Sequence, residues 1–391
     1  MDMKQEKEKA LLLLKRKRIL NAKRKQNIQQ FTNWFIPLII ISKIVRWTIL
    51  KPQLVDTSIG WYMVKNIYQD KTSSFSINGN ATENSIILFD FINIFNIRSY
   101  IGWEIFFTII LNIPVFFMIK EYYRTHPLTK WRENLFIYMN VAILNIFCFN
   151  MAKEPYQMLF FILMYYCIML RNTTYMKKCF LIIGVLLLCT FLARRYYALV
   201  IMFFVFLVFT VGYLFKKNAR KKLTNKQLTV YITLMLLAIC GLHYLFMAFM
   251  GGKDPETYLE LIRVNNRVGS LASSEITPIF NANGGPLFTA EYFIKIFRLL
   301  FPVELLLKGK ITYIFLIVNQ LLLVTFMIRA FKGMGGKGNS TRLTQTSSVS
   351  TRNIALFTYI AFLLCSAAFE PDFGSWVRHQ GVTFPIILLI L

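Results

Sequence analysis

The sequence predicts an all-α membrane protein that crosses the bilayer about ten times. Of its 391 residues, 56% are hydrophobic and only 16% are charged, whereas soluble domains have about 25% charged residues. The mean hydropathy is correspondingly positive, at +0.49. The apolar residues gather in separate runs, many of them close to the roughly 20 residues that a helix needs to cross a bilayer. These observations favour a polytopic membrane protein over a soluble globular domain.

We assign membrane spans to the successive apolar runs. They cover residues 34–50, 102–119, 134–149, 155–170, 179–193, 197–215, 228–250, 311–329, 354–369 and 382–391. The tenth run has only ten residues, which is about 15 Å of helix and half the thickness of the hydrocarbon core. It is therefore either a re-entrant segment or the beginning of a longer span.

The basic residues indicate how the chain is oriented. Its net charge is +26, from 45 Lys and Arg against 19 Asp and Glu. The excess lies in alternate short connections, as expected for cytoplasmic loops. This distribution places the N-terminus in the cytoplasm and argues against a nucleic-acid partner. Residues 1–30 are strongly basic, and we expect them to form a helix on the anionic inner leaflet, with membrane lipids as partners.

The remaining residues, 31–391, are expected to form one multi-span membrane domain. Two long connections, 51–101 and 251–310, fall on its outer side, and a Gly- and Ser/Thr-rich linker, 331–352, falls on its cytoplasmic side. The outer connections contain apolar segments that are too short to cross the bilayer, and we predict that they are interfacial helices. These segments are 59–68, 86–95 and 292–301.

Cysteine usage and motif searches point away from metal and cofactor chemistry. All six cysteines lie in apolar runs, where a thiol behaves as a small buried hydrophobe. No set of His, Asp and Glu has metal-ligand spacing, and there is no G-x-S-x-G nucleophile motif. The Gly-rich segment 333–338 lacks the strand and helix that flank a phosphate-binding loop. We therefore expect no metal and no cofactor.

Three polar clusters stand at the ends of predicted spans. They are Lys153–Glu154, Arg194–Tyr196 and Glu370–Gln380, and the charge count places all three on the outer side. An unpaired charge beside hydrocarbon costs several kcal/mol, so such groups are kept either to bind a polar ligand or to pair with one another. For Lys153–Glu154, the alternative interpretation is a local ion pair at a solvated hairpin tip.

The residue types in these clusters favour anion binding. The guanidinium groups of Arg194 and Arg195 suit phosphate or carboxylate, which arginine binds in a bidentate manner. Tyr196 suits stacking on a sugar ring or anchoring at the membrane interface. In the second outer connection, Arg263 and Arg267 share one helical face, where a surface salt-bridge lattice with nearby glutamates is the alternative.

The arrangement of spans and polar turns resembles bacterial oligosaccharide repeat-unit polymerases and the related GT-C-type glycosyltransferases that use polyprenyl-linked sugars. The residues that carry the resemblance are Lys153–Glu154 opening a span, Arg194–Tyr196 closing another, Phe297–Pro302 and Arg378–Pro385. Asp56 stands where GT-C enzymes have an acidic residue early in the first outer loop, but without the second adjacent acid. This departure favours the polymerase version.

The resemblance implies an enzyme of envelope polysaccharide assembly in the bacterial plasma membrane. Its substrate would be a polyprenyl-diphosphate-linked glycan, and its further partners other polysaccharide-assembly membrane proteins. Such a reaction needs cations for the diphosphate and a carboxylate that takes the proton of the acceptor hydroxyl. The catalytic candidates are Glu154, Asp56 and Asp372, and the substrate-binding candidates are Lys153, Arg194, Arg195, Tyr196, Arg263, Arg267, Arg378 and His379.

A transporter or flippase for the same lipid-linked glycans is the main alternative. It would use the arginines for binding alone, and inverted repeats or broken helices in matching halves would favour it. No such pair is evident, and the charges concentrate at the outer ends of spans. An outer-face acyltransferase would need a catalytic histidine near the start of the chain, and residues 1–125 contain no histidine.

Overall fold

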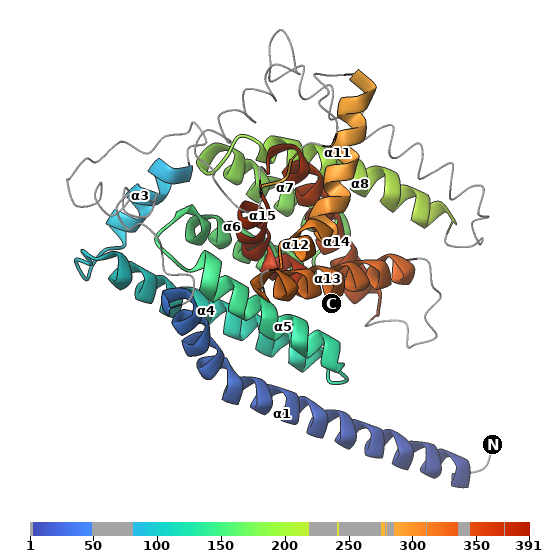
Figure 1. Cartoon of the computed structure of the whole chain (residues 1–391). Helices are drawn as coiled ribbons and strands as arrows, with labels where there is room; N and C mark the ends of the chain where they lie inside the picture. Colours follow the sequence, from blue (N-terminus) through green and yellow to red (C-terminus); the bar gives the residue numbers. More distant parts are fainter. Residues whose placement is uncertain are drawn as a thin grey trace.

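A computed structural model shows a chain built from helices (Figure 1). It describes residues 3–48, 81–218, 285–309, 311–334, 345–370 and 372–391, with the short pieces 241, 275–277 and 279. The elements are α1 (Met3–Thr48), α3 (Ala81–Phe91), α4 (Tyr100–Thr125), α5 (Trp131–Ile143), the π-helix η1 (Leu144–Cys148), α6 (Lys153–Met169), α7 (Tyr175–Leu192), α8 (Tyr197–Asn218), α11 (Gly285–Leu300), α12 (Val303–Leu307), α13 (Ile311–Met334), α14 (Gln345–Phe369), α15 (Phe373–Val382) and α16 (Phe384–Leu388). Within these residues there is no strand beyond one isolated bridge between Glu275 and Asp372. The predicted all-α fold is confirmed.

Five of the described helices are long and apolar enough to cross a membrane. They are α1, α4, α7, α13 and α14. The apolar part of α8, Tyr197–Thr210, is shorter, and α5 and α6 have 13 and 17 residues. The predicted span 228–250 lies outside the described residues. The structure therefore supports a membrane protein with five candidate spans, and the number ten stays a prediction.

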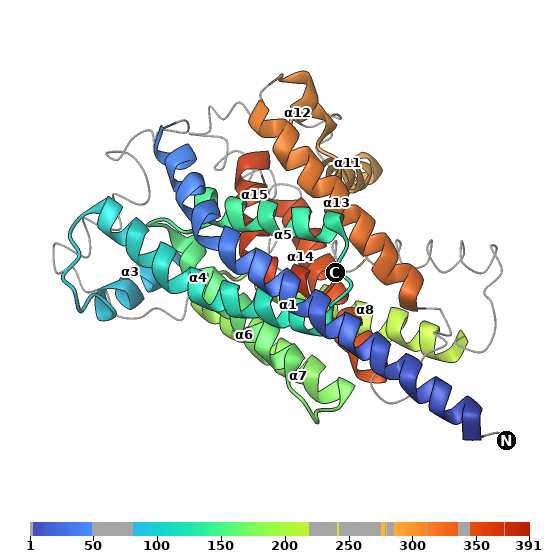
Figure 2. The ribbon, with the colours of Figure 1, turned by 90° about the horizontal axis from the view of Figure 1, so that it is seen from below.

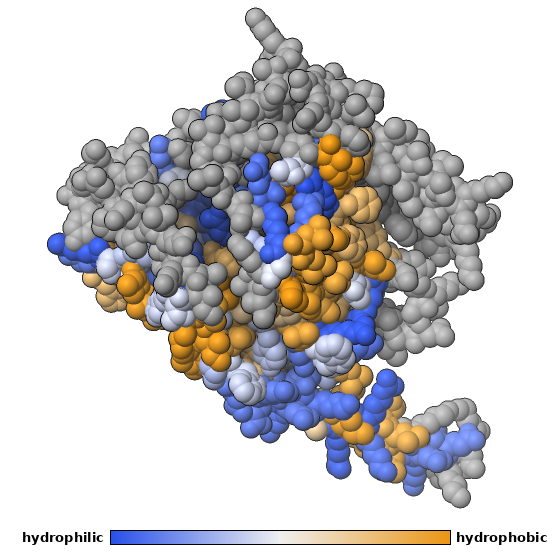
Figure 3. Space-filling view, viewed as in Figure 1, coloured by the Kyte–Doolittle hydropathy of each residue, from blue (hydrophilic) through white to orange (hydrophobic). Residues whose placement is uncertain are grey.

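The N-terminal helix differs from the expected arrangement. The basic segment and the first predicted span form one helix, α1, which runs unbroken from Met3 to Thr48. No glycine or proline precedes Pro37, so nothing in the sequence ends the helix between the two parts. Figures 1 and 2 show the C-terminal half of α1 lying across α4 and α5, while its N-terminal half projects from the body. Hydrophilic and apolar side chains are interspersed on that projecting part (Figure 3).

Helix α14 is the centre of the bundle. Its residues from Ile354 to Ala368 are almost all buried, and it packs against α6, α7, α8, α11, α13 and α16. A helix that is apolar on all sides is expected to be covered on all sides. Small residues on α14, including Ala361 and Ala367, allow the neighbouring helices to approach closely.

The segment Glu370–Gln380, which the sequence predicts to be a polar turn, has a different structure. Most of it forms α15. Asp372 caps this helix, because its carboxylate accepts hydrogen bonds from the backbone N–H and the hydroxyl of Ser375, each at 2.9 Å. The final apolar run forms α16, a five-residue helix buried against α4, α6 and α14. Within the described residues it is a short buried helix.

Helix α11 carries its polar side chains inward. Glu291, Lys295 and Arg298 are buried, whereas Phe297 is 64% exposed. Arg298 forms ion pairs with Glu304 of α12 and, at 3.6 Å, with Glu291, which ties α12 to α11. The exposed apolar surface of these two helices suits contact with hydrocarbon rather than with water.

Gly381 sets how closely α15 approaches η1. A Cβ atom placed on Gly381 would lie 2.6 Å from Sγ of Cys148, which is closer than packed atoms tolerate. We expect Gly381→Ala to destabilise the protein by about 1–3 kcal/mol through overpacking. The double variant with Cys148→Ala should recover much of this loss, because it removes the sulfur atom.

Thermal unfolding in detergent measures this effect. Gly184→Ala, on an exposed part of α7 where nothing lies within 4 Å of the new Cβ, is the matched control. It should be neutral or slightly stabilising, because alanine is the better helix former. Equal melting temperatures for the two single variants would show that α15 and η1 do not pack this closely.

Candidate functional site

The candidate site is built around the end of α5. There the helix widens into the π-helix η1, and the chain then turns through residues 149–152 into α6. Single-turn π segments inside helices are frequent at functional sites. A helix end also leaves backbone carbonyls without donors from the helix itself. In this protein side chains from α1 supply those donors.

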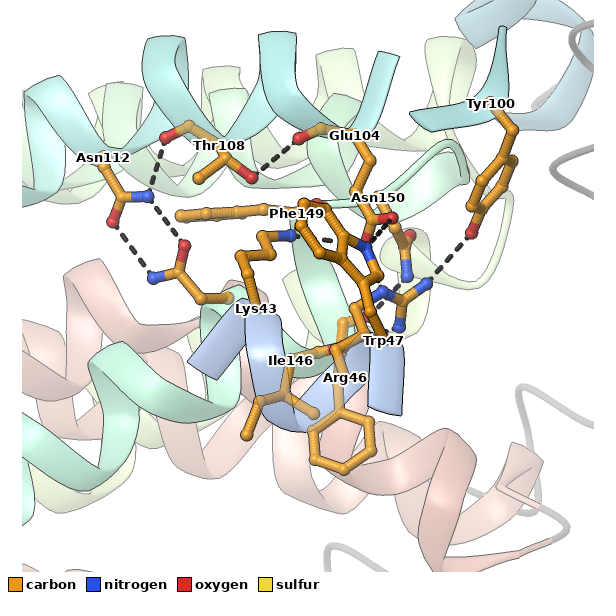
Figure 4. A network of polar contacts seen from close by, with 12 residues as sticks. Lys43, Arg46, Trp47, Tyr100, Glu104, Thr108, Asn112, Ile146, Phe149 and Asn150 are labelled. Carbon is orange, nitrogen blue, oxygen red and sulfur yellow. Dashed lines mark hydrogen bonds and ion pairs between the residues drawn. The ribbon is translucent and has the colours of Figure 1, made fainter. Parts of the chain in front are cut away.

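The buried carboxylate of Glu104, on α4, organises these donors (Figure 4). Glu104 has 0% exposure. Its Oε1 accepts hydrogen bonds from Nζ of Lys43 at 3.3 Å and from Nε of Arg46, and its Oε2 accepts one from Nε1 of Trp47 at 2.9 Å. Arg46 also donates to the hydroxyl of Tyr100 at 2.9 Å. We call these five residues the Glu104 network.

The same two cations hold the end of η1. Nζ of Lys43 donates to the carbonyl of Phe149 at 2.8 Å, and Nη1 of Arg46 donates to the carbonyl of Ile146 at 2.6 Å. Cations are favourable at the C-terminal end of a helix, where the carbonyl dipoles point outward. Because both oxygens of Glu104 are already engaged, the network acts as a structural clamp on the turn that leads into α6.

A second group of charged side chains lies where α6 begins. Each member is within electrostatic range of at least two others. We call it the Glu154 cluster, and its members are Lys153 and Glu154 of α6, Arg194 of the α7–α8 turn, Glu370 at the end of α14, and Arg378 and His379 of α15. The fold thus joins side chains from the three polar segments that are far apart in the sequence.

Glu154 is the unusual member of the Glu154 cluster. It is 1% exposed, yet neither carboxylate oxygen has a hydrogen-bond partner on another of the described residues. Among the described residues, the nearest cationic atom is Nη1 of Arg378, 3.9 Å from Oε1, which is longer than a hydrogen bond. One turn later on α6, Gln157 is equally buried and equally without partners. Since an unpaired buried polar group is costly, these side chains indicate a place for a polar ligand or for water.

Glu370 and His379 form a buried pair beside Glu154. Nδ1 of His379 lies 2.5 Å from Oε1 of Glu370. Burial lowers the pKa of His379, so the neutral ring donates its Nδ1 hydrogen to the carboxylate. Burial also opposes ionisation of Glu370, but the hydrogen bond from His379 and the charges of Arg194 and Lys295 outweigh it and lower the pKa of this carboxyl group. Glu370 therefore remains an anion and fixes the orientation of the histidine ring.

The Glu154 cluster has an excess of positive charge. With His379 neutral, its three cations face two carboxylates. Burial, followed by the charge of Arg194, lowers the pKa of Lys153 to about 8. Burial favours the neutral form of Glu154, but the charges of Arg378 and Lys153 outweigh it and lower the pKa of that carboxyl group. A buried site with one uncompensated positive charge is suited to an anion.

The structure brings together five of the residues that the sequence analysis singled out. They are Lys153, Glu154, Arg194, Arg378 and His379. Tyr196 lies beside them: its ring is 5.4 Å from the guanidinium of Arg194 and 5.4 Å, between centroids, from the ring of Phe369. Tyr196 thus supports the position of Arg194.

Two of the remaining predicted site residues, Arg195 and Asp372, are described, and neither is a member of the Glu154 cluster. Arg195 is exposed, and the carboxylate of Asp372 caps α15. The predicted residues Asp56, Arg263 and Arg267 lie outside the described part of the chain.

Sequence reasoning missed the Glu104 network and Gln157. Glu104 had a detectable signal, because an acidic residue inside a predicted span is rare and usually has a specific partner. Lys43 and Arg46, near the end of the first predicted span, were the matching cations. Gln157 had only its spacing from Glu154, three residues along a predicted helix, which places both side chains on one face.

Within the described residues no three His, Cys, Asp or Glu side chains are grouped so that they would hold a metal ion. Comparisons with protein-family models, with curated proteins and with solved structures give no match for this chain. Fold alone does not imply function, so the chemistry of the Glu154 cluster is the basis for the function proposed below.

We expect Glu104→Gln to destabilise the protein by about 3–5 kcal/mol, because it leaves the buried charges of Lys43 and Arg46 without their counter-ion. Adding Lys43→Met should recover part of the loss, since one of the two uncompensated charges is then removed. Glu121→Gln is the control: Glu121 pairs with Arg124 on the exposed side of α4 at 2.8 Å, and such pairs contribute only about 0–1 kcal/mol. Thermal unfolding in detergent should separate the two glutamate variants, and similar losses would contradict a structural role for the network.

Proposed function

We propose that this protein is a membrane glycosyltransferase that polymerises polyprenyl-diphosphate-linked oligosaccharide units on the outer face of the bacterial plasma membrane. The observation that supports the proposal best is the carboxylate of Glu154, which is buried without a hydrogen-bond partner beside three cations. The charge pattern of the sequence supports the topology, with about ten spans and the N-terminus in the cytoplasm.

The cations suit a diphosphate leaving group. All three cations are partly exposed: 43% of the Arg378 side chain is accessible, and Arg194 and Lys153 have intermediate exposure. A ligand that binds Arg378 is therefore also within electrostatic range of Lys153, which Arg194 approaches as well. Diphosphate becomes a good leaving group when its growing negative charge is stabilised, and stabilisation that increases in the transition state raises turnover.

Glu154 suits the role of general base. In the proposed reaction the oxygen of an acceptor hydroxyl attacks the anomeric carbon, the bond from that carbon to the diphosphate breaks, and Glu154 takes the hydroxyl proton. Without ligand, the surrounding cations lower the pKa of Glu154 and weaken it as a base. A bound diphosphate compensates those cations, which raises the pKa of Glu154 when the substrate is present.

The first test is Glu154→Gln, which keeps the shape of the side chain and removes the proton acceptor. We expect turnover to fall about 10²–10⁴-fold, the contribution of a general base, while the lipid-linked substrate still binds. Purified protein is assayed for elongation of the lipid-linked glycan, with Glu121→Gln as the control. Near wild-type elongation by Glu154→Gln would exclude this residue as the base.

The same variants tested in cells distinguish an enzyme from a transporter. In a strain that lacks the gene, the wild-type protein should restore long surface glycans, and Glu154→Gln should leave single repeat units on the carrier at the outer face. Accumulation of these units on the inner face instead would mean that the protein is a flippase.

A pH profile tests the role of Lys153. Its positive charge is present below pH 8 and is lost as the pH rises through its pKa of about 8, so the affinity for an anionic substrate should fall above that pH. Lys153→Arg should remove this alkaline loss, because arginine stays protonated. KM for the lipid-linked glycan, measured from pH 7 to about pH 10, reports the difference. An identical rise in KM for both proteins would show that Lys153 does not contact the anion.

A further inference from the structure

Buried amides in this fold are normally paired across helix interfaces. Three such pairs occur in the described residues, and each joins two elements. They are Asn112 with Asn145 at 2.8 and 3.2 Å, Asn140 with Asn319 at 2.9 Å, and Gln320 with Gln380, whose two side chains exchange hydrogen bonds. Asparagine and glutamine are among the polar side chains that link membrane helices by hydrogen bonds.

Gln157 departs from this pattern. Its side chain is 1% exposed, and neither Oε1 nor Nε2 has a partner among the described residues. Nearly all buried polar groups in proteins are hydrogen-bonded, so each exception needs a physical reason. Here both ends of one amide are unpaired, and this amide stands one turn from a carboxylate that is also unpaired.

Gln157 lies on the same face of α6 as Glu154. Gln157 follows Glu154 by three residues and precedes Phe161 by four, so the three lie along one face of α6. The ring of Phe161 packs against that of Phe362 on α14, with 5.7 Å between centroids. This face of α6 is therefore turned toward α14, and α14 ends next to Glu370 of the cluster.

The hydrogen-bonding capacity of the Gln157 amide distinguishes between phosphate, apolar and hydroxyl-bearing ligands. A carboxamide has one acceptor oxygen and two donor hydrogens and carries no charge. A phosphate oxygen can only accept, so it would use the donor half of the amide and leave Oε1 unpaired. An apolar ligand would use neither half. A hydroxyl group both donates and accepts, so hydroxyl groups of a sugar satisfy both ends of the amide.

Asn150 is a second buried amide with an unpaired acceptor near the start of α6. It lies in the turn before α6, is buried, and its Nδ2 donates to the carbonyl of Phe147 at 3.1 Å. That bond leaves its Oδ1 buried without a partner. A fixed acceptor of this kind is satisfied by a hydroxyl group and not by a phosphate oxygen.

We infer that Gln157 binds hydroxyl groups of the glycan, next to the reacting hydroxyl at Glu154, and so determines which sugar is accepted. This inference rests on the proposed function for the identity of the glycan carrier. The two residues contact different hydroxyl groups of the substrate: Glu154 takes the proton of the reacting hydroxyl, and Gln157 binds hydroxyls that do not react.

Gln157→Met tests the inference, because it nearly keeps the length of the side chain and removes both polar atoms. Two probes are compared by thermal shift on the full-length protein in detergent: a polyprenyl-diphosphate-linked oligosaccharide extracted from membranes of the same organism, and polyprenyl diphosphate without sugar. We expect the wild-type protein to bind the glycosylated lipid more tightly. Gln157→Met should weaken that binding about tenfold for each hydrogen bond lost and leave binding of the sugar-free lipid unchanged.

A matched pair of variants tests whether the amide is unpaired in the free protein. Without ligand, Gln157→Met should raise Tm, since it removes a buried group that has no partner. Gln320→Met should lower Tm, since it leaves Gln380 without its partner. If Gln157→Met does not fold, Gln157→Asn serves instead: it keeps an amide at this position but shortens its reach, and it should lose the preference for the glycosylated lipid.

Each outcome bears on a different claim. If Gln157→Met loses the preference for the glycosylated lipid and still binds the sugar-free lipid, the inference is supported. This holds even if the wild-type protein shows no elongation, and in that case only the proposed enzyme function fails. Unchanged preference in Gln157→Met overturns the inference, and elongation by the wild-type protein would still support the proposed function.

Discussion

The burial of one carboxylate, that of Glu104, constrains much of this structure. A carboxylate with no access to water is tolerated only where cations and hydrogen-bond donors surround it, and α1 supplies them. Because Lys43 and Arg46 also bind the carbonyls at the end of η1, the same contacts fix α1, α4 and η1 relative to one another. The first residues of α6 follow within a short turn, so the position of Glu154 depends on this clamp.

Glu104 and Glu154 are the same residue type and are almost equally buried, yet their surroundings differ. Glu104 accepts hydrogen bonds from three side chains, whereas Glu154 accepts none from another described residue. A satisfied buried ion pair gives rigidity, and an unsatisfied one leaves interaction energy that a ligand can use. The contrast assigns structural work to the first carboxylate and ligand chemistry to the second.

Much of this arrangement could be predicted from apolar runs and charge, because both act locally. Helices α4, α7, α13 and α14 follow the predicted spans, and the polar residues at span ends, such as Arg194 and Arg378, do converge. What could not be predicted depends on contacts between distant segments. The pairing of Glu104 with Lys43 joins residues 61 positions apart. Helix α15 is not predicted either, because its ten residues contain no apolar run longer than two residues.

Helix α11 connects the Glu154 cluster to the outer surface of the bundle. Its Lys295 is buried and contributes to the low pKa of Glu370, whereas Phe297 on the same helix, and Leu306 and Leu307 on α12, are exposed. Apolar surface facing outward is stable only against hydrocarbon, so these two helices place charged and lipid-facing groups a few residues apart. A substrate with an anionic head and a polyprenyl tail has the same two parts, and on the proposed function its tail stays in the bilayer beside α11 and α12. Its head then reaches Arg378 and Lys153 without the tail leaving hydrocarbon, which avoids the large cost of exposing an apolar chain to water.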